Sequence, residues 1–542
     1  MIHENESTKL GPIADHERIL VPSYLTPGVY VEEVSSSSAT LSAGLTAVAA
    51  FVGFTASHPT DDPSDPQGLK PRLVTSWTQY EGLYGGFVAG AMLPHSVYGF
   101  FNNGGGMAYI VRVAHRVASK DPGQLALPSI DRALGQPLQV TTVGPADGLS
   151  VVIEKGSATE DGKAPKFNLV LAQNGEETER YNDVTLTDVA ATVNKTSKRV
   201  KVETKVDLKS ITDLSLASLK TGVFDVVPAP SLPVEVKPKH FAGSESDRTG
   251  INGLVIADEV TMVMVPDLLT AARKADGSID LGMWKAVQTA LITHCELQAN
   301  RLAILDAPPG MSPQQIKEWR SDVAMYDSAF AAFYYPWIRI DNPVSTSPGD
   351  ATILVPPSGH VAGIWSRVDD TRGVWKAPAN EVIRGVLSAE IDITKGEQSL
   401  LNPIGINCIR PFGTRGIRIW GARTLSSNSD WTYINVRRLF NMIETAIMEG
   451  TQFAVFEPND QKLWEGLKRT INAFLRGLWR DGALFGVTAE QAFFVKCDAE
   501  NNPPDSIDQG KVIVEVGIAP VKPAEFVIFR IAQFSGGTSI SD

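Results

Sequence analysis

The chain is short of cysteine, histidine and positive charge, and each shortage excludes a class of protein. Its 542 residues include three cysteines (Cys295, Cys408 and Cys497), about a hundred residues apart and without a CxxC pair, so neither a disulfide framework nor a thiolate metal site is expected. The eight histidines are scattered, and no two stand at metal-ligand spacing on a helix. A net charge of −12 argues against a nucleic-acid binder that relies on bulk positive charge.

Long apolar runs are missing as well. No stretch approaches the roughly 18 consecutive apolar residues that could span a bilayer. The opening residues, MIHENESTKLGPIADHERIL, contain no apolar signal region, so we expect synthesis in the cytoplasm without a standard export signal. Hydrophobic residues make up 43% and charged residues 20%, as in ordinary folded proteins, and the length predicts about two to four domains.

Sequence motifs of nucleotide binding and hydrolysis do not occur: GxxxxGK[ST], GxSxG and HExxH are all missing. The best enzymatic candidates are Asp267 and Asp306, which end the predicted strands VMVPD and AILDAP. Because α/β sheets place ligand groups at such strand ends, a soluble α/β enzyme using both aspartates is one alternative. The simpler interpretation is that both begin loops or cap the following turns, and we expect no enzyme activity, cofactor or metal.

Alternating strands and helices predict a largely parallel α/β domain interrupted by a β-rich insertion. TAVAAFVGFT (46–55), MAYIVRV (107–113) and AFAAFYYPWIRI each read as one strand, and LGMWKAVQTALITHCELQAN reads as a helix with positions 284, 287, 291 and 295 inward. The predicted parts are an N-terminal extended arm (1–34), an α/β middle domain (35–115 plus 246–355), an inserted β-rich outer domain (116–245), and a C-terminal domain (356–542) with a C-terminal arm (524–542).

The C-terminal region carries two amphipathic helices. The first, in LSSNSDWTYINVRRLFNMIETAIMEG, has its apolar stripe at Val436, Leu439, Phe440, Ile443 and Ile447. The second, in NDQKLWEGLKRTINAFLRGLWRDG, is expected to turn inward Leu463, Leu467, Ile471, Phe474 and Leu478. Its opposite face carries Lys462, Arg469, Arg476 and Arg480. This face is either a solvated helix surface or a docking strip for an acidic partner.

The segment from Phe526 to Ile531 is β-prone and apolar on both faces, with Arg530 as the only interruption. A bare strand of this kind invites edge-to-edge association, which proteins normally suppress. The sequence therefore predicts a pairing partner for this strand.

Several longer segments carry a resemblance: PSYLTPGVYVEEV, SVYGFFNNGGGMAYIVRV, AAFYYPWIRI, VPPSGHVAGIWSRVDDTRGVWKAPAN, IRIWGARTL, INVRRL and VKPAEFVIFRIAQF. In this order they resemble contractile tail sheath proteins from about residue 22 to 534, least so in the variable outer insertion. The chain is similar to the sheaths of contractile phage tails, R-type pyocins and extracellular contractile injection systems, and these alternatives stay open. It does not resemble the split two-protein sheath of type VI secretion, because both halves are in one chain.

The resemblance implies an α+β and α/β multidomain fold. Its α/β sheath core domain carries the inserted all-β outer domain, and its C-terminal α+β domain is completed by strands exchanged between subunits. The exchanged strands would be the two arms, with hinges near Ser35–Ser38 and near Gly517, Pro520 and Pro523. The arm residues expected to pair with neighbours are Tyr24, Val29, Tyr30, Val31, Val34, Phe526, Val527, Ile528, Phe529 and Ile531.

The resemblance also implies partners and a mechanism. Subunits would form a helical homo-oligomer of stacked rings around an inner tube protein, with baseplate and terminal cap proteins, and without nucleic acid or membrane insertion. Contraction would drive the tube through a target envelope. The phage tail or tail-like particle would be assembled in a bacterial or host cytoplasm and would either stay there or be released. The residues expected to face the tube are Lys462, Arg469, Arg476 and Arg480, with Arg437 and Arg438 as the alternative strip. A generic self-assembling shell protein is the remaining alternative.

Overall fold

A computed structural model of the chain describes residues 45–531, except 60, 63, 66, 89, 114–121, 131–135, 146–148, 159–163, 174, 206–217, 229–235, 275, 346–348 and 350. The described residues form two compact units, one made of 45–442 with 520–531 and the other of Ile443–Ala519. The predicted N-terminal arm, with Tyr24, Val29, Tyr30, Val31 and Val34, lies outside the described residues.

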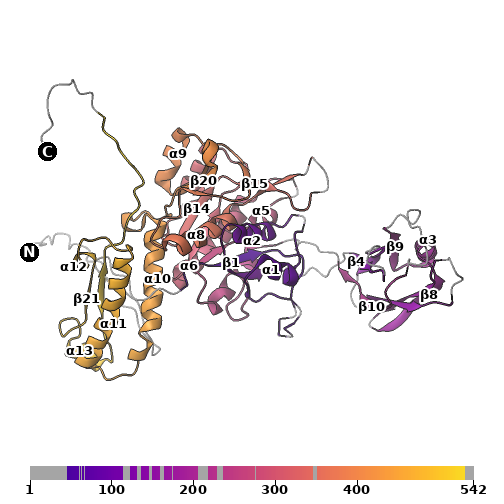
Figure 1. Cartoon of the computed structure of the whole chain (residues 1–542), viewed down its shortest axis with the longest axis horizontal. Helices are drawn as coiled ribbons and strands as arrows, with labels where there is room; N and C mark the ends of the chain where they lie inside the picture. Colours follow the sequence, from indigo (N-terminus) through magenta and orange to yellow (C-terminus); the bar gives the residue numbers. More distant parts are fainter. Residues whose placement is uncertain are drawn as a thin grey trace, which may run out of the picture. The chain divides into compact units, whose positions relative to one another are not determined.

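The larger unit is built on a nine-stranded sheet in the order β17-β20-β19-β14-β13-β12-β1-β3-β2 (Figure 1). Neighbouring strands from β19 to β3 are parallel, and β2, β20 and β17 are antiparallel to their neighbours. The strands are β1 (Val48–Gly53), β2 (Arg72–Val74), β3 (Met107–Arg112), β12 (Met262–Met264), β13 (Leu302–Asp306), β14 (Ala331–Tyr335), β17 (Glu381–Val382), β19 (Ile406–Pro411) and β20 (Ile417–Trp420). The predicted largely parallel α/β layer is confirmed.

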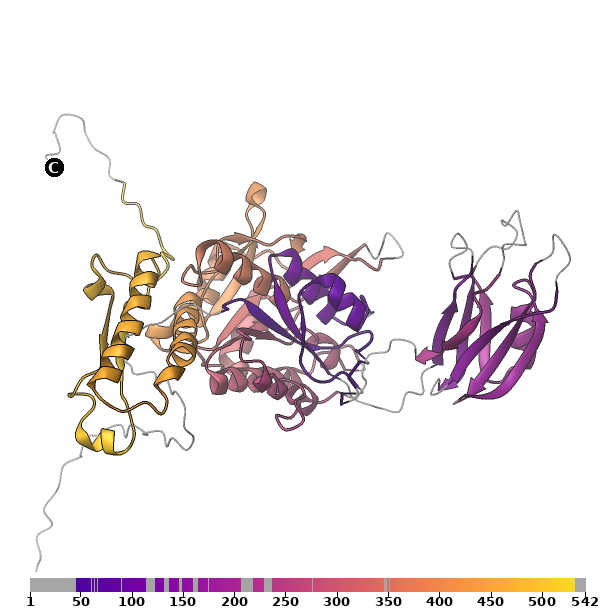
Figure 2. The same ribbon diagram turned by 60° about the horizontal axis from the view of Figure 1, so that its bottom comes forward.

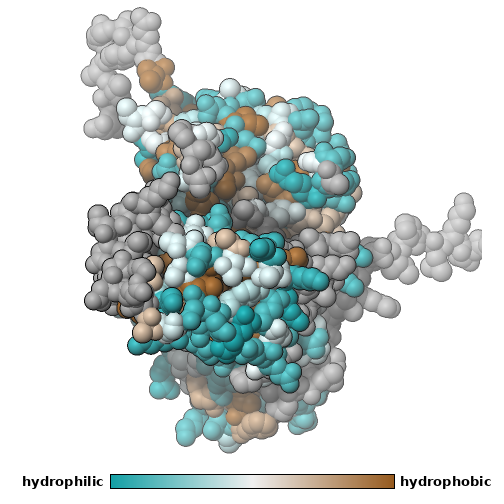
Figure 3. Space-filling model, turned by 90° about the vertical axis from the view of Figure 1, so that its right-hand side faces the viewer, coloured by the Kyte–Doolittle hydropathy of each residue, from teal (hydrophilic) through white to brown (hydrophobic). Residues whose placement is uncertain are grey.

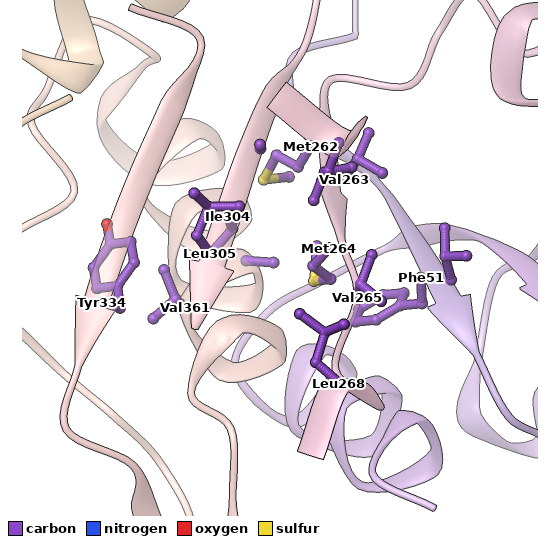
Figure 4. Close-up of a cluster of buried hydrophobic side chains, with 14 of the residues drawn as sticks. Phe51, Met262, Val263, Met264, Val265, Leu268, Ile304, Leu305, Tyr334 and Val361 are labelled. Carbon is purple, nitrogen blue, oxygen red and sulfur yellow. The ribbon is translucent and has the colours of Figure 1, made fainter. Parts of the chain in front are cut away.

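The helices of this unit are α1 (Trp77–Tyr84), α2 (Leu93–Asn102), α4 (Pro238–Ala242), α5 (Leu268–Ala271), α6 (Leu281–Gln298), α7 (Pro313–Glu318), α8 (Ser358–Arg372), α9 (Lys395–Leu401) and the start of α10 (Ile434–Gly450). All residues of β1, β13 and β14 are buried, so both faces of the central sheet are covered. Figure 4 shows part of this core: Phe51 of β1 lies beside Met264 of β12, with Leu268 of α5 next to them. The four predicted inward positions of α6 are buried, as expected.

Helices α2 and α8 pack unusually closely because glycines line their contact. A Cβ atom on Gly359 would stand 2.3 Å from the carbonyl oxygen of Ser96, and one on Gly363 would stand 2.4 Å from that of Phe100. Gly99 of α2 lies in the same way against the ring of His360. Any side chain at these positions would force the two helices apart.

The insertion has its own core. Two antiparallel sheets, β10-β6-β7-β8 and β11-β4-β5-β9, form the layers seen in Figure 2. The elements are β4 (Pro122–Leu127), β5 (Leu138–Pro145), β6 (Leu149–Lys155), β7 (Phe167–Gln173), β8 (Glu176–Val184), α3 (Val189–Thr196), β9 (Val200–Thr204), β10 (Gly222–Asp225) and β11 (Val227–Pro228). Buried apolar side chains such as Val140, Val151 and Leu169 join in a cluster separate from the main core. The surface that the insertion turns to the viewer in Figure 3 is mainly hydrophilic.

One prediction about strands was wrong. AFAAFYYPWIRI is not one strand, because it divides at Pro336, which has no N–H to donate. Its second half, β15 (Ile338–Asp341), leaves the large sheet and pairs with β16 (Thr352–Val355) and β18 (Val386–Ala389). The large sheet also continues past the predicted domain boundary at residue 356, since β19 pairs with β14 and brings β20 and β17 with it. The compact units divide at 442/443 instead.

The smaller unit contains the later turns of α10, then α11 (Gln461–Arg480), α12 (Ala489–Ala492), β21 (Phe493–Lys496), α13 (Pro504–Asp508) and β22 (Glu515–Ile518). Strands β21 and β22 form a two-stranded antiparallel sheet. The buried stripe of α11 includes Leu463, Leu467, Ile471 and Leu478, as predicted. It also includes Leu475, whereas Phe474 is only partly buried.

Candidate assembly surfaces

Asp267 is a structural acceptor and not an open catalytic group. Its carboxylate is fully buried and accepts hydrogen bonds from the N–H groups of Phe54 (2.6 Å), Met92 and Leu93 (3.3 Å). The last two N–H groups stand at the start of α2, where a helix has unpaired donors. Burial raises the pKa of Asp267 to about 7, against these hydrogen bonds, which lower it.

Asp306 has the same role at another helix. Its carboxylate accepts from the N–H of Ser358 (2.8 Å) and from the Ser358 hydroxyl (2.6 Å), at the start of α8. Burial raises the pKa of this carboxyl to about 7. Both aspartates therefore cap helices distant in sequence, not the turns that follow them, and neither leaves an oxygen exposed to a substrate.

Other chemistry finds no support in the described part of the chain. There, no group of histidine, cysteine, aspartate and glutamate side chains is arranged to hold a metal ion. Among the helices that the structure describes, none has the length and apolar character needed to cross a membrane. The three cysteines are buried and unpaired with one another.

The C-terminal arm exposes five large apolar side chains within six residues. The exposed fractions are 73% for Phe526, 68% for Val527, 78% for Ile528, 82% for Phe529 and 95% for Ile531. The predicted strand is not formed within the single chain, and these residues run clear of the folded elements (Figures 1 and 2). Such a continuous exposed apolar stretch is typical of a site of association.

The residue before this stretch is firmly held. Glu525 accepts two hydrogen bonds from Arg423, at 2.9 Å from Nε and 2.6 Å from Nη2. The side-chain amide of Asn402 donates a third at 2.7 Å, and the hydroxyl of Tyr433 a fourth at 3.3 Å. Burial raises the pKa of Glu525, but the hydrogen bonds from Arg423 and Asn402 outweigh it and hold the pKa below its usual value. No local sequence pattern predicts this cluster, because Arg423 and Glu525 are 102 positions apart.

The small sheet of the other unit has unpaired edges in the described chain. Strand β21 pairs only with β22, and each has a free side toward which another strand could add. Two-stranded sheets are marginally stable alone, and a third strand improves them. Phe494 of β21, with 45% of its side chain exposed, stands on the sheet face away from the buried neighbour Phe493.

The predicted basic face of α11 is exposed. Lys462, Arg469, Arg476 and Arg480 are all exposed, on the side opposite the buried leucines. The alternative strip is wrong, because Arg437 and Arg438 are 0% and 4% exposed. Arg437 lies over the ring of Trp431, 4.2 Å from its centroid, and Arg438 forms an ion pair with Asp369.

Comparison with known proteins agrees with this picture. The phage tail sheath protein central domain model matches residues 263–425 and the phage tail sheath C-terminal domain model matches 426–534, together half of the chain. The tail sheath protein of Vibrio phage KVP40 is 30% identical over 190 residues, or 34% of this chain and 27% of that protein. That of Burkholderia phage BcepMu is 28% identical over 251 residues, or 43% and 50%. The chain thus spans half or less of the length of these curated relatives.

A solved structure extends the likeness over nearly the whole chain. The anti-feeding prophage helical sheath in its contracted state is 25% identical, with a TM-score of 0.54, and the match covers 94% of this chain and 100% of that one. The two share a mixed α/β multidomain architecture with several sheets. The resemblance seen in the sequence is confirmed: the chain belongs to the phage tail sheath family and is a structural protein, not an enzyme.

Proposed function

We propose that the protein is the subunit of a contractile sheath, which polymerises helically around an inner tube and contracts to drive the tube through a target envelope. The exposed apolar arm from Phe526 to Ile531, in a chain of this family, is the observation that carries the proposal. The particle is a phage tail or an extracellular contractile injection device. The structural similarity to the contracted helical sheath of the anti-feeding prophage supports this proposal.

Each C-terminal arm adds as a strand to the two-stranded sheet of another copy. Main-chain hydrogen bonds to an unpaired edge of β21 or β22 (Phe493–Lys496, Glu515–Ile518) supply affinity, and the apolar side chains fix the register. The N-terminal arm, residues 1–34, occupies the other edge in the same way. Four strands would then form the sheet, which meets the usual requirement for independent stability.

Strand addition of this kind makes an open chain of subunits. An arm of one copy contacts a different surface, the sheet edge, of the next copy, so the interface is heterologous. A heterologous contact whose rotation does not close a ring propagates as a helix. The arms keep the lattice connected while the folded units move as rigid bodies during contraction.

The exposed basic face of α11 contacts the tube. Lys462, Arg469, Arg476 and Arg480 would face acidic residues of the tube protein. Contraction has to separate every subunit from the tube, and exposed ion pairs suit a breakable contact because each is weak and screened by salt. Repeated around every ring, these pairs can still fix the register of sheath on tube. Baseplate and terminal cap proteins bind the two ends of the polymer.

The insertion forms the outermost layer. Its separate core, and the mainly hydrophilic face seen in Figure 3, suit a solvent-facing domain that the lattice does not need.

Negative-stain electron microscopy of the expressed full chain tests the proposal. We expect striated tubes of sheath subunits. Discrete particles, or flat arrays as from a generic shell protein, would contradict the proposal.

A further inference from the structure

The first turn of α10 holds the chain where the C-terminal arm leaves the folded unit. The side-chain amide of Asn435 donates to the carbonyl of Val521 (3.1 Å) and to that of Trp375 (2.8 Å). Tyr433, just before the helix, donates to the carboxylate of Glu525. The chain between Val521 and Glu525 is therefore fastened at both ends, directly before the exposed apolar stretch.

The same turn holds the chain near the other arm. Arg438 donates from Nη2 to the carbonyl of Thr46 at 2.8 Å, at the beginning of the described chain. Its guanidinium also binds both carboxylate oxygens of Asp369, at 2.8 Å and 2.5 Å. The side chains of Arg438 and Asp369 are 3% and 4% exposed. Breaking a buried pair leaves an uncompensated charge, so this guanidinium is fixed in place.

Both attachment points lie close together. Asn435 and Arg438 are three residues apart on one helix, which separates them by about 5 Å along its axis. The N-terminal and C-terminal connections of the subunit therefore meet within one turn of α10, although Thr46 and Val521 stand at opposite ends of the described sequence.

We propose that these residues form an arm anchor, through which each subunit passes tension from the neighbour holding one arm to the neighbour holding the other. The anchor is defined as Tyr433, Asn435 and Arg438 together with Arg423, Glu525 and Asp369. The inference rests on the proposed function, since the arms must pair with other copies. The anchor also changes the expected position of the C-terminal hinge. The flexible part of the chain begins after Glu525, not at Gly517, Pro520 and Pro523.

Nitroxide spin labels test the anchor directly. Cysteines introduced at Leu45, Ala524 and Ile528 are all at exposed positions, whereas the native cysteines are buried and escape labelling. In dissociated wild-type subunits we expect restricted labels at 45 and 524 and a free label at 528. The double variant Asn435→Ala with Glu525→Gln should free the label at 524. Arg438→Lys should partly free the label at 45, because the Thr46 carbonyl also accepts from the Thr261 hydroxyl. The control Arg180→Gln, which removes exposed ion pairs of the insertion, should change neither.

Assembled sheaths test the transmission of tension. Sheaths of either anchor variant should form but should break under a fixed dose of sonication into pieces several-fold shorter than those of wild type and Arg180→Gln. A wild-type label at 524 as free as that at 528, or variant sheaths as long as the control after sonication, would overturn the anchor. If Arg438→Lys does not fold, the Asn435→Ala and Glu525→Gln double variant decides. Failure of the proposed function would appear separately, as a label at 528 that stays free in assembled wild-type sheaths.

Discussion

Ser358 gives both its N–H and its hydroxyl to the carboxylate of Asp306, at 2.8 Å and 2.6 Å, in the buried centre of the α/β unit. Asp306→Ala should lower the free energy of unfolding by about 1–3 kcal/mol, because the two donors would be left buried without an acceptor. Urea unfolding followed by circular dichroism measures the loss. Asp276, which accepts the same pair of bonds from Ser278 at the exposed surface, is the matched control. Equal losses at the two positions would contradict a structural role for the buried carboxylate.

A second prediction concerns the stability of the fold at low pH. Burial and, to a smaller extent, the neighbouring His95 lower the pKa of His360 to about 4, while the unfolded value is near 6.5. As the pH falls, the unfolded chain therefore binds a proton at this histidine before the folded chain does. The free energy of unfolding is unaffected above pH 6.5 and decreases as the pH falls toward 4. His360→Gln should remove this dependence.

The free energy of unfolding of the variant, relative to that of wild type, should then rise by about 1.4 kcal/mol for each unit by which the pH falls from 6.5 to 4. Urea unfolding of both proteins across this range measures the difference. A constant difference would show that His360 does not titrate between the two states. His58, partly exposed, offers a control, since its His58→Gln variant should change the slope less.

The basic face of α11 gives a third prediction. Arg469→Glu with Arg476→Glu should leave the subunit folded, because both side chains are exposed, but should yield empty or prematurely contracted sheaths. Lys201→Glu with Lys205→Glu, two exposed lysines of the insertion, reverses the same charge elsewhere. Electron microscopy of particles co-expressed with the tube protein measures the tube-filled fraction. Filled, extended sheaths from the α11 variant would refute the assigned contact.

The insertion gives a fourth prediction, on its independence from the α/β unit. Replacing residues 116–235 by a short Gly/Ser linker, which keeps α4 with its Phe241 in the main core, should still permit assembly, and the isolated insertion should unfold cooperatively because its buried cluster is its own. Thermal melts of both pieces and microscopy of the shortened chain check this. Loss of the α/β unit on this replacement would show that the insertion does not fold separately from it.

Local patterns predicted much of the fold. The continuous apolar run around Val48–Gly53 and the apolar spacing of Leu281–Gln298 each reflect burial within one element, so the local sequence located β1 and α6. What failed depended on contacts distant in sequence. Nothing near Arg438 indicates that Asp369 will pair with it, and nothing near Glu525 points to Arg423. The family resemblance supplied the assembly hypothesis, and the exposed arm gave it a physical basis.

The most direct test of strand exchange is electron microscopy of a chain ending at Glu525, compared with the full chain and with one ending at Phe534, which lacks only the small polar tail. The chain ending at Glu525 retains the side chain that Arg423 holds but loses the exposed apolar residues from Phe526 onward. We predict long tubes from the full chain and from the chain ending at Phe534, and folded subunits without long tubes from the chain ending at Glu525. Long, contractile tubes from the chain ending at Glu525 would contradict the account.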